Sequence, residues 1–106
     1  MKFMMFVCPD KAELARGNTA AIPAAVEEWA TEMERRGVRL QGHVLASDAS
    51  GVRVRDGSVS VDPSDASAPI AGFNILECAD LDEALEVSAK HPMAAFGTLE
   101  LRAIAA

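Results

Sequence analysis

Apolar residues recur along the chain in two patterns, one typical of strands and one typical of helices. Residues 2–8 are apolar at almost every position, which predicts a first strand that is covered on both faces. Residues 40–47, 70–78 and 97–102 are predicted as three further strands. The chain therefore carries four principal strands, and the segments between them follow other patterns.

The first helical segment has apolar residues at steps of four, three and four, so they share one stripe: Ile22, Val26, Trp29 and Met33. Asn18 or Thr19 is expected to cap this helix. Pro23 fits its first turn, and Gly37 suits its end. Residues 10–18, which precede the helix, are predicted as a polar loop.

The second helix is predicted to begin at a pair that resembles a capping box, Asp80 with Glu83 three residues later. Its inward stripe is expected to hold Leu81, Ala84, Leu85, Ser88 and Ala89. His91 lies at its end, because Pro92 disfavours helical geometry in the residue before it. There we expect either a capping cation that the helix dipole favours or a site residue at the rim of the sheet.

A hairpin is predicted between the second and third principal strands. Asp56-Gly57 supplies the positive φ angles of a type I′ turn. A two-residue turn pairs Val54 with Val59 and Val52 with Val61, so the four valines share one face. The opposite face holds Arg53, Arg55, Ser58 and Ser60. The residues that follow, 62–69, have no periodicity and are predicted as a mobile loop.

Without the hairpin, the order of elements is β-α-β-β-α-β, the split βαβ of a ferredoxin-like α+β fold. Residues 1–106 are expected to form one domain, since this length supports one core. Right-handed crossovers place both helices on one face of an antiparallel sheet. The other face then exposes more apolar surface than monomers usually tolerate. We therefore expect a homodimer that closes through the sheet face.

Charge and composition exclude several classes of function. The formal charge is −6 and no Lys/Arg cluster occurs, so nucleic acid is not an expected partner. No apolar run approaches the roughly 20 residues that span a bilayer, and Pro9-Asp10-Lys11 interrupts the pattern of a signal peptide. We expect a cytoplasmic protein without a membrane partner.

Metal and cofactor motifs are also missing from the sequence. Cys8 and Cys78 are too far apart for a C-x-x-C motif, and we expect two buried, reduced thiols. The two histidines have no metal-ligand spacing, and no G-x-G-x-x-G, P-loop or G-x-S-x-G occurs. Neither a dedicated metal site nor a cofactor is expected.

Polar residues on the sheet form the best candidate site. Alternation places four of them on the face away from the helices: Gln41, His43, Glu100 and Arg102. Asn74 joins them if Phe73 and Ile75 pack under the helices. His43 is the candidate proton carrier, because an imidazole changes charge near neutral pH, although a lone histidine on a strand is more often a structural or surface group. Glu100 and Arg102 form either an ion pair or part of a binding site.

Several motifs together resemble the YCII-related family, whose members include the DGPF proteins. They are the strand Lys2-Phe3-Met4-Met5, the Trp29 helix closing at Arg36-Gly37-Val38, Gly42-His43, the hairpin Val52-Arg53-Val54-Arg55-Asp56-Gly57, Asp80-Leu81-Asp82-Glu83-Ala84-Leu85, His91-Pro92 and Gly97-Thr98-Leu99-Glu100-Leu101-Arg102. After the hairpin the DGPF subgroup has Asp-Gly-Pro-Phe, whereas this chain has Asp62-Pro63-Ser64-Asp65. The chain therefore resembles a divergent member.

The resemblance implies a dimeric α+β barrel and acid/base chemistry on small cyclic or aromatic-derived compounds, of the lyase or isomerase kind. On this chain it implies His43 as the acid/base group and Asp62 as the residue that orients it. The predicted ligand-binding residues are Asn74, Glu100, Arg102 and His91. A non-catalytic, dimeric ligand-binding or regulatory module is the alternative, because relatives associated with sigma-factor regulation belong to the same family.

Overall fold

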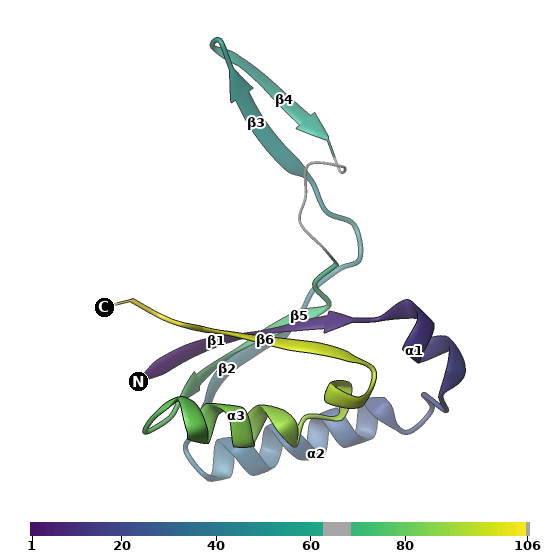
Figure 1. Ribbon diagram of the computed structural model, residues 1–106, viewed down its shortest axis with the longest axis vertical. Helices are drawn as coiled ribbons and strands as arrows, with labels where there is room; N and C mark the ends of the chain where they lie inside the picture. Colours follow the sequence, from purple (N-terminus) through teal and green to yellow (C-terminus); the bar gives the residue numbers. More distant parts are fainter. Residues whose placement is uncertain (63–68, 106) are drawn as a thin grey trace.

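A four-stranded antiparallel sheet, covered by helices on one face, forms the body of the protein (Figure 1). The computed structural model describes residues 1–62 and 69–105. The sheet consists of β1 (Lys2–Pro9), β2 (Arg39–Val44), β5 (Gly72–Glu77) and β6 (Gly97–Ala103). Its spatial order is β2-β5-β1-β6, so β2 and β6 are the edges. The predicted ferredoxin-like α+β fold with an inserted hairpin is confirmed.

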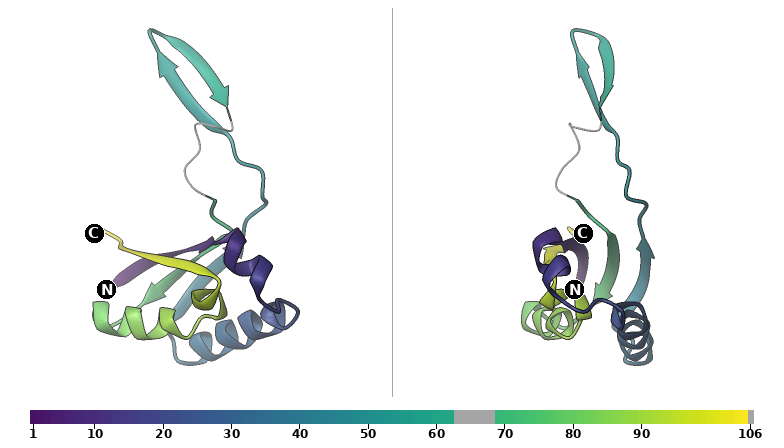
Figure 2. Two further views of the ribbon diagram at one scale, coloured as in Figure 1. Left: turned by 45° about the vertical axis from the view of Figure 1, so that its right-hand side comes forward. Right: turned by 90° about the vertical axis from the view of Figure 1, so that its right-hand side faces the viewer.

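Two main helices lie side by side beneath the sheet (Figure 2). The helices are α1 (Lys11–Arg16), α2 (Ile22–Arg35), α3 (Leu81–Ala89) and the short 3₁₀ helix η2 (Pro92–Ala95). The prediction of a loop over residues 10–18 is wrong, because the Asp10 carboxylate accepts the backbone N–H groups of Ala12 and Glu13 and so caps α1. The two predicted main helices are both present.

Helix α2 is fixed to the body by its apolar stripe. Trp29 and Met33 are buried, and the Trp29 indole donates a 3.0 Å hydrogen bond to the carbonyl of Val87 in α3. No side chain caps its start, so the expected cap at Asn18 or Thr19 is wrong. Asn18 instead accepts the N–H of Ala20, in the turn that precedes the helix.

Helix α3 begins as predicted, because the Asp80 carboxylate accepts the N–H of Glu83 at 2.9 Å. Its buried stripe differs from the prediction. Ala84, Val87 and Ser88 are buried, whereas Leu81 and Leu85 are half exposed. Val87 lies six positions after Leu81 and two after Leu85, so at 3.6 residues per turn it points to a different side of the helix from both leucines.

The core lies between the sheet and the helices. Its buried side chains are Phe3, Met5, Val7, Trp29, Met33, Val38, Leu76, Cys78, Ala84 and Val87. The face without helices has an apolar centre of half-buried side chains: Met4, Phe6, Phe73 and Ile75. Strand β1 is therefore covered by helices on one face only. The second cover that its sequence predicts is not supplied by the described part of the chain.

The two cysteines are free thiols at opposite ends of neighbouring antiparallel strands; Cys78 is buried, but Cys8 is only half-buried, so the expectation of two buried thiols is wrong for Cys8. Burial raises the pKa of both Cys8 and Cys78, with Glu100 adding to the effect at Cys8 and Glu83 at Cys78. Both thiols are therefore held in their protonated, unreactive form.

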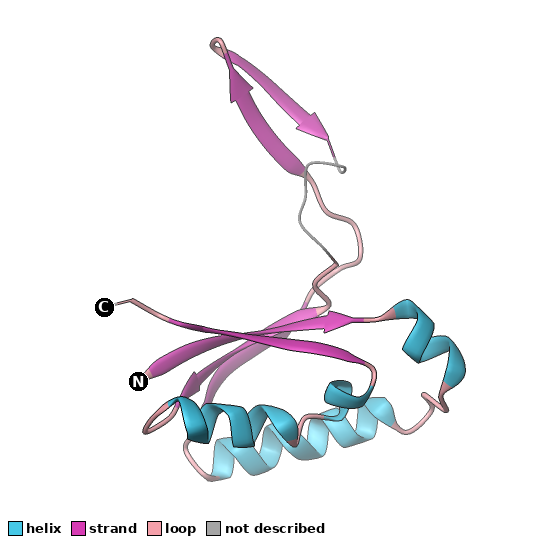
Figure 3. Ribbon diagram, in the orientation of Figure 1, coloured by secondary structure: helices cyan, strands magenta, loops and turns pink. Residues whose placement is uncertain are grey.

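The inserted hairpin, β3 (Gly51–Arg55) with β4 (Ser58–Asp62), stands apart from the body (Figures 1 and 3). We call these residues the arm. Asp56 and Gly57 have φ angles of 51° and 77°, as a type I′ turn requires. Val52 pairs with Val61 and Val54 with Val59, so the predicted register is confirmed. Most of the predicted mobile loop, residues 63–68, lies outside the described residues.

Candidate functional site

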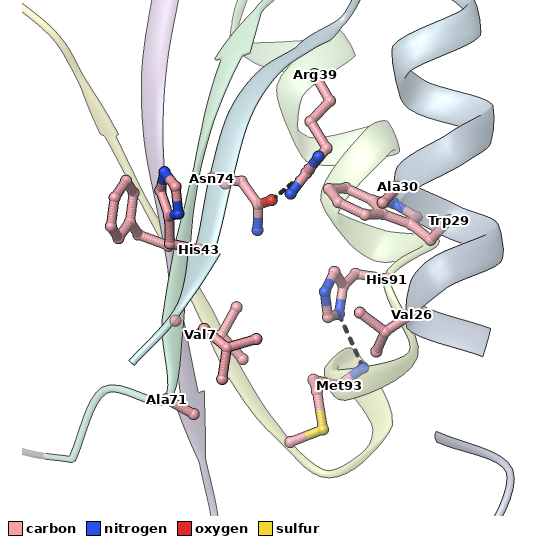
Figure 4. A pocket seen from close by; sticks show the side chains of 14 residues that line it. Val7, Val26, Trp29, Ala30, Arg39, His43, Ala71, Asn74, His91 and Met93 are labelled. Carbon is pink, nitrogen blue, oxygen red and sulfur yellow. Dashed lines mark hydrogen bonds between the residues drawn. The ribbon is translucent and has the colours of Figure 1, made fainter. Parts of the chain in front are cut away.

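A cavity of about 260 Å³ lies between the sheet and helix α2, next to the edge strand β2 (Figure 4). Much of its lining is apolar and comes from Val7, Val26, Trp29, Ala30, Ala71 and Met93. Three polar side chains enter it: Arg39 from β2, Asn74 from β5 and His91 from the segment before η2. A mainly apolar pocket with a few convergent polar groups is the usual form of a small-molecule site.

Arg39 reaches the cavity because β2 contains an irregularity in its pairing. Arg39 lies opposite Leu76, whereas Gln41 lies opposite Ile75, so the register shifts between them. Paired residues in a sheet share a face, and Leu76 is in the core beneath the helices. The shift therefore turns Arg39 toward the helices, where regular alternation would turn it away.

Arg39 fixes the orientation of Asn74. The Nε atom of Arg39 donates a 2.7 Å hydrogen bond to Oδ1 of Asn74, and the same guanidinium forms an ion pair with Glu34 of α2. Because Oδ1 is engaged by Arg39, the amide nitrogen of Asn74 points into the cavity (Figure 4). Asn74 is only 6% exposed, so this amide is a fixed, buried donor.

Gly42 leaves the space that this arrangement needs. A Cβ atom built on Gly42 would lie 2.2 Å from Oδ1 of Asn74 and 2.3 Å from Nη2 of Arg39. Both distances are far below a van der Waals contact. Glycine at this position therefore lets the guanidinium and the amide meet directly over the backbone of β2.

His91 is buried against Trp29, with ring centroids 4.7 Å apart in an edge-to-face arrangement. The backbone N–H of Met93 donates a 3.0 Å hydrogen bond to Nδ1. Nδ1 is therefore unprotonated, and in the neutral ring the proton lies on Nε2. Burial, and then the charge of Arg39, lower the pKa of His91 to about 4. The prediction of a capping cation is wrong, since His91 is neutral near pH 7.

All three polar side chains offer hydrogen-bond donors to the cavity. Arg39 has only N–H groups, Asn74 has its oxygen engaged, and His91 has its acceptor nitrogen engaged by Met93. Among the described residues, no carboxylate lines this cavity. An arrangement of donors without side-chain acceptors suits a ligand that carries a carbonyl, phenolate or carboxylate oxygen.

The open face of the sheet holds the other predicted site residues. The Nε2 atoms of Gln41 and His43 are 3.3 Å apart, and the His43 ring packs against Phe73 at 5.5 Å between centroids. His43 is exposed, and its ring points away from Arg39 and Asn74 although its strand borders the cavity (Figure 4). Arg102 donates a 2.9 Å hydrogen bond to Glu100 within the same strand.

The structure therefore divides the predicted site between the two faces of the sheet. The placement of Asn74 on the open face is wrong, because Phe73 and Ile75 occupy that face and Asn74 is buried beneath the helices. The condition on which that placement depended, burial of Phe73 and Ile75 under the helices, is not met. Asn74 and His91 point into the cavity, whereas His43, which also borders it, turns its ring away from Arg39 and Asn74 (Figure 4).

Asp62 lies at the end of the arm, where it pairs with Gly51. His43 belongs to the four-stranded sheet, so one chain does not place the two predicted catalytic residues in the same sheet. Their joint role stays a prediction.

Arg39 is the cavity residue that sequence reasoning missed. It stands one residue before the predicted strand of residues 40–47 and two before Gln41, so extending the alternation would assign it to the same face as His43. The shift in register cannot be read from residue types. Gly42, directly opposite Asn74, is the one local signal of a close approach at this point.

A family comparison gives the wider context for this site. The model of the YCII-related domain matches residues 1–106, which is the whole chain. The chain belongs to the YCII-related family. The resemblance seen in the sequence motifs is thereby confirmed, and no curated protein matches the chain.

A solved structure shares the fold of this YCII-related protein. It is 5-chloro-2-hydroxyhydroquinone dehydrochlorinase (TftG) from Burkholderia phenoliruptrix AC1100, in complex with 2,5-dihydroxybenzoquinone. The TM-score is 0.60 at 15% sequence identity, over 99% of this chain and 94% of that chain. The likeness at this identity establishes the fold over nearly the full length of both chains.

Metal and membrane sites have no support in the described part of this YCII-related protein. No group of three or more histidine, cysteine, aspartate or glutamate side chains gathers there in a way that would hold a metal ion. None of its helices in the described ranges is long and apolar enough to cross a bilayer. The cavity beneath β2 is therefore its best candidate for function.

Proposed function

We propose that this protein binds a small ring compound through an oxygen atom in the cavity beneath β2 and stabilises negative charge on that oxygen. The observation that carries the proposal is the convergence of Arg39, Asn74 and His91 as donors in a mainly apolar cavity. Fixed donors aimed at a developing oxyanion are an effective way to lower the barrier of proton transfer next to a carbonyl.

The volume of the cavity limits the size of the ligand. About 260 Å³ exceeds the roughly 150 Å³ that accommodates benzene in an engineered apolar cavity. It is below the range of roughly 300–1,000 Å³ that is typical of drug-sized ligands. A single six-membered ring with a few oxygen or halogen substituents fits these limits. The dihydroxybenzoquinone bound to the dehydrochlorinase is a compound of this class.

The chemistry we propose is acid/base isomerisation or elimination without a cofactor. A base removes a proton from a ring carbon, the electron pair moves toward the carbonyl oxygen, and the donors hold the resulting enolate. The enolate then takes a proton at another carbon, or expels a leaving group with its bonding electrons. Neutral His91 suits the role of a polarising donor, because a neutral imidazole donates without forming an ion pair that must later be broken.

The acid/base group of this proposal is His43, which the family resemblance favours, with Asp62 as its orienting partner. Its strand borders the cavity, but its ring faces the open side of the sheet. Gln41 lies within 3.3 Å of His43, and the ring is exposed on the open face of the sheet.

A non-catalytic ligand-binding module is the second candidate. The observation that favours it is the lack of a carboxylate among the described residues that line the cavity. Binding through Arg39, Asn74 and His91 needs no general base, whereas turnover does. The two candidates therefore share the ligand class and differ only in proton transfer.

We also propose that the protein is a homodimer that closes through the open face of the sheet, as a dimeric α+β barrel. Met4, Phe6, Phe73 and Ile75 form an apolar centre on this face, and Gln41, His43, Glu100 and Arg102 lie around it. An apolar centre with a polar rim is the usual composition of such an interface. A partner sheet would supply the second cover that the sequence of β1 predicts.

The binding proposal is tested by titrating 2,5-dihydroxybenzoquinone into the protein and measuring heat. The decisive variant is Asn74→Asp, which keeps the shape of the side chain and replaces its cavity-facing donor by a carboxylate oxygen. The matched control is Gln41→Glu, the same amide-to-acid change on the open face. We expect Asn74→Asp to weaken binding at least about tenfold and Gln41→Glu to leave it within about twofold.

Equal effects of the two variants would contradict the assignment of the cavity.

Turnover is tested separately by NMR, as exchange of the ring protons of dihydroxybenzoquinone with deuterated water. An enzyme raises the exchange rate above that in buffer, and His43→Asn lowers it without changing the affinity. A binding module leaves the exchange rate at the buffer value, in both the wild type and the variant.

A further inference from the structure

The arm presents an apolar face that nothing in the described chain covers. The exposed fractions of its valines are 64% for Val52, 56% for Val54, 68% for Val59 and 62% for Val61. These four side chains face the same way, because Val52 pairs with Val61 and Val54 with Val59. The other face of the ribbon carries arginine and serine, so the arm has one apolar and one polar side.

An arm of this kind is not expected to be stable alone in water. A two-stranded hairpin is marginal in isolation and needs further strands or a packing surface. The sequence nevertheless favours a single hairpin structure for the arm, because Asp56-Gly57 forms a type I′ turn and the cross-strand valine pairs lie on one side only. A clean separation of apolar and polar sides is typical of a ribbon that packs on one side and faces water on the other.

The body of the same chain does not supply the packing surface. The arm rises away from the four-stranded sheet in each view (Figures 1 and 2). The radius of gyration is 15.8 Å, whereas a compact domain of this length has about 13 Å. The longest dimension of the chain is 48 Å and its shortest is 19 Å. The arm therefore extends beyond the domain, as exchanged elements do in symmetric dimers.

We infer that the valine face of the arm packs against a second copy of this chain. Charge favours this occupant. The arm carries Arg53, Arg55, Asp56 and Asp62, two residues of each sign, so the formal charge of −6 lies entirely on the rest of the chain. The bodies of two copies carry charge of the same sign and repel each other. The arm is neutral and apolar, so it can approach a second copy at the least electrostatic cost.

The contact extends the sheet-to-sheet dimer proposed above but does not depend on the cavity. In a two-fold dimer each copy gives one arm and receives one, so both arms are covered by a single symmetry operation. The arm then adds four valines per chain to the interface and strengthens the contact between the two copies. If the ligand does not bind in the cavity, this inference about the arm is unaffected. If the arm does not pack against a second copy, the proposal for the cavity is unaffected.

The test compares two variants of strand β4 that differ in the face they change. Val59→Asp places a charge on the valine face of the arm. Ser60→Asp places the same charge one residue later, on the polar face of the arm. Mass is measured by sedimentation over a dilution series, with one chain at 11.2 kDa. We expect Val59→Asp to raise the dimer dissociation constant at least about a hundredfold, because each dimer loses two buried valines, and Ser60→Asp to raise it less than about threefold.

Hydrogen exchange distinguishes a partner from an arm that folds back on its own body. The amides of residues 51–62 are followed in the wild-type protein at high and low concentration. Protection that appears only at concentrations where the dimer forms supports the inference. Protection independent of concentration, a wild type that is monomeric throughout, or equal dimerisation of the two variants would overturn it. A far-UV melt of both variants verifies that the body remains folded.

Discussion

Mild acid should destabilise the folded chain through His91. Burial, followed by the charge of Arg39, lowers the pKa of this histidine to about 4, from an ordinary value of 6.5. Between these values the unfolded chain binds a proton that the folded chain does not bind. The unfolding free energy is therefore unaffected by His91 above about pH 6.5 and falls as the pH drops toward 4.

The size of the effect follows from the gap between the two pKa values. Linkage gives a loss of about 2 kcal/mol at pH 5 and about 3 kcal/mol at pH 4, as an order of magnitude. His91 is only 4% exposed, so little solvent screening reduces it. Domains of this kind are stable by about 5–15 kcal/mol, and this one histidine therefore removes a substantial fraction of the total.

The assay is urea unfolding at about pH 7.5 and about pH 5, followed by Trp29 fluorescence at one protein concentration. His91→Asn is the matched variant, because asparagine also accepts an N–H at a helix start and does not titrate. Exposed ion pairs such as Glu32–Arg35 and Glu86–Lys90 hold the carboxyl pKa values down and also weaken in acid. Both proteins share these pairs, so the difference between them reports His91.

We expect the wild type to lose about 2 kcal/mol more than His91→Asn between the two pH values. An equal loss in both proteins would refute the reasoning, because it would mean that His91 reaches water or is already charged in the folded state. A smaller stability of His91→Asn at both pH values has no bearing on the outcome. It reports the lost contact with Trp29 and not the titration.

Three further predictions concern the cavity, the tryptophan beside it and the cap of α3, with urea unfolding and quinone titration as the measurements. Gly42→Ala should lower the free energy of unfolding by about 1–3 kcal/mol and abolish quinone binding, because the new Cβ atom displaces the donors of the cavity. Unchanged binding would contradict this prediction. Trp29→Phe should cost about 1–3 kcal/mol, since the carbonyl of Val87 loses its buried donor; a neutral effect would mean that water replaces the indole. Asp80→Ala should cost about 1 kcal/mol through the lost cap, whereas Asp82→Ala, in the same first turn, should cost less; the reverse order would reject the cap.

The sequence predicts the fold where local chemistry and burial pattern point the same way. The arm is the clearest case, because Asp56-Gly57 sets the turn and two valine pairs set the register, and both agree. The start of α3 is another, because Asp80 and Glu83 satisfy backbone N–H groups whatever the rest of the chain does.

The predicted site fails where tertiary structure overrides strand alternation. Phe73, Asn74 and Ile75 alternate correctly, but residue type suggests the wrong face, because apolar Phe73 and Ile75 face away from the helices and polar Asn74 is buried. A sheet with apolar side chains on both faces has no uniquely apolar side, so residue type alone does not say which face meets the helices. Arg39 is missed for another reason, since the register shift is produced by pairing with β5.

The charge state of His91 also cannot be predicted from the sequence. A histidine before proline at the end of a helix predicts a cation near the helix dipole. In the structure the chain turns at this residue into η2, so His91 stands at the start of a new helical turn and accepts an N–H there. A helix start disfavours positive charge, and Trp29 completes its burial. The 3₁₀ turn Pro92–Ala95 thus places His91 at a helix start and not at a helix end, and burial and the charge of Arg39 keep its ring neutral.

Strand β2 carries candidate site residues on both faces of the sheet, because the alternation of its side chains is broken once. Gln41 and His43 follow the regular pattern toward the open face, and Gly42 between them leaves room on the cavity side. The register shift before Gln41 brings Arg39 to that same side. An edge strand tolerates such a shift, because it pairs with one neighbour only and its other edge need not stay in register. One donor of the cavity, Arg39, and the candidate proton carrier, His43, thus lie within five consecutive residues of one edge strand, with the donor Asn74 paired opposite Gly42.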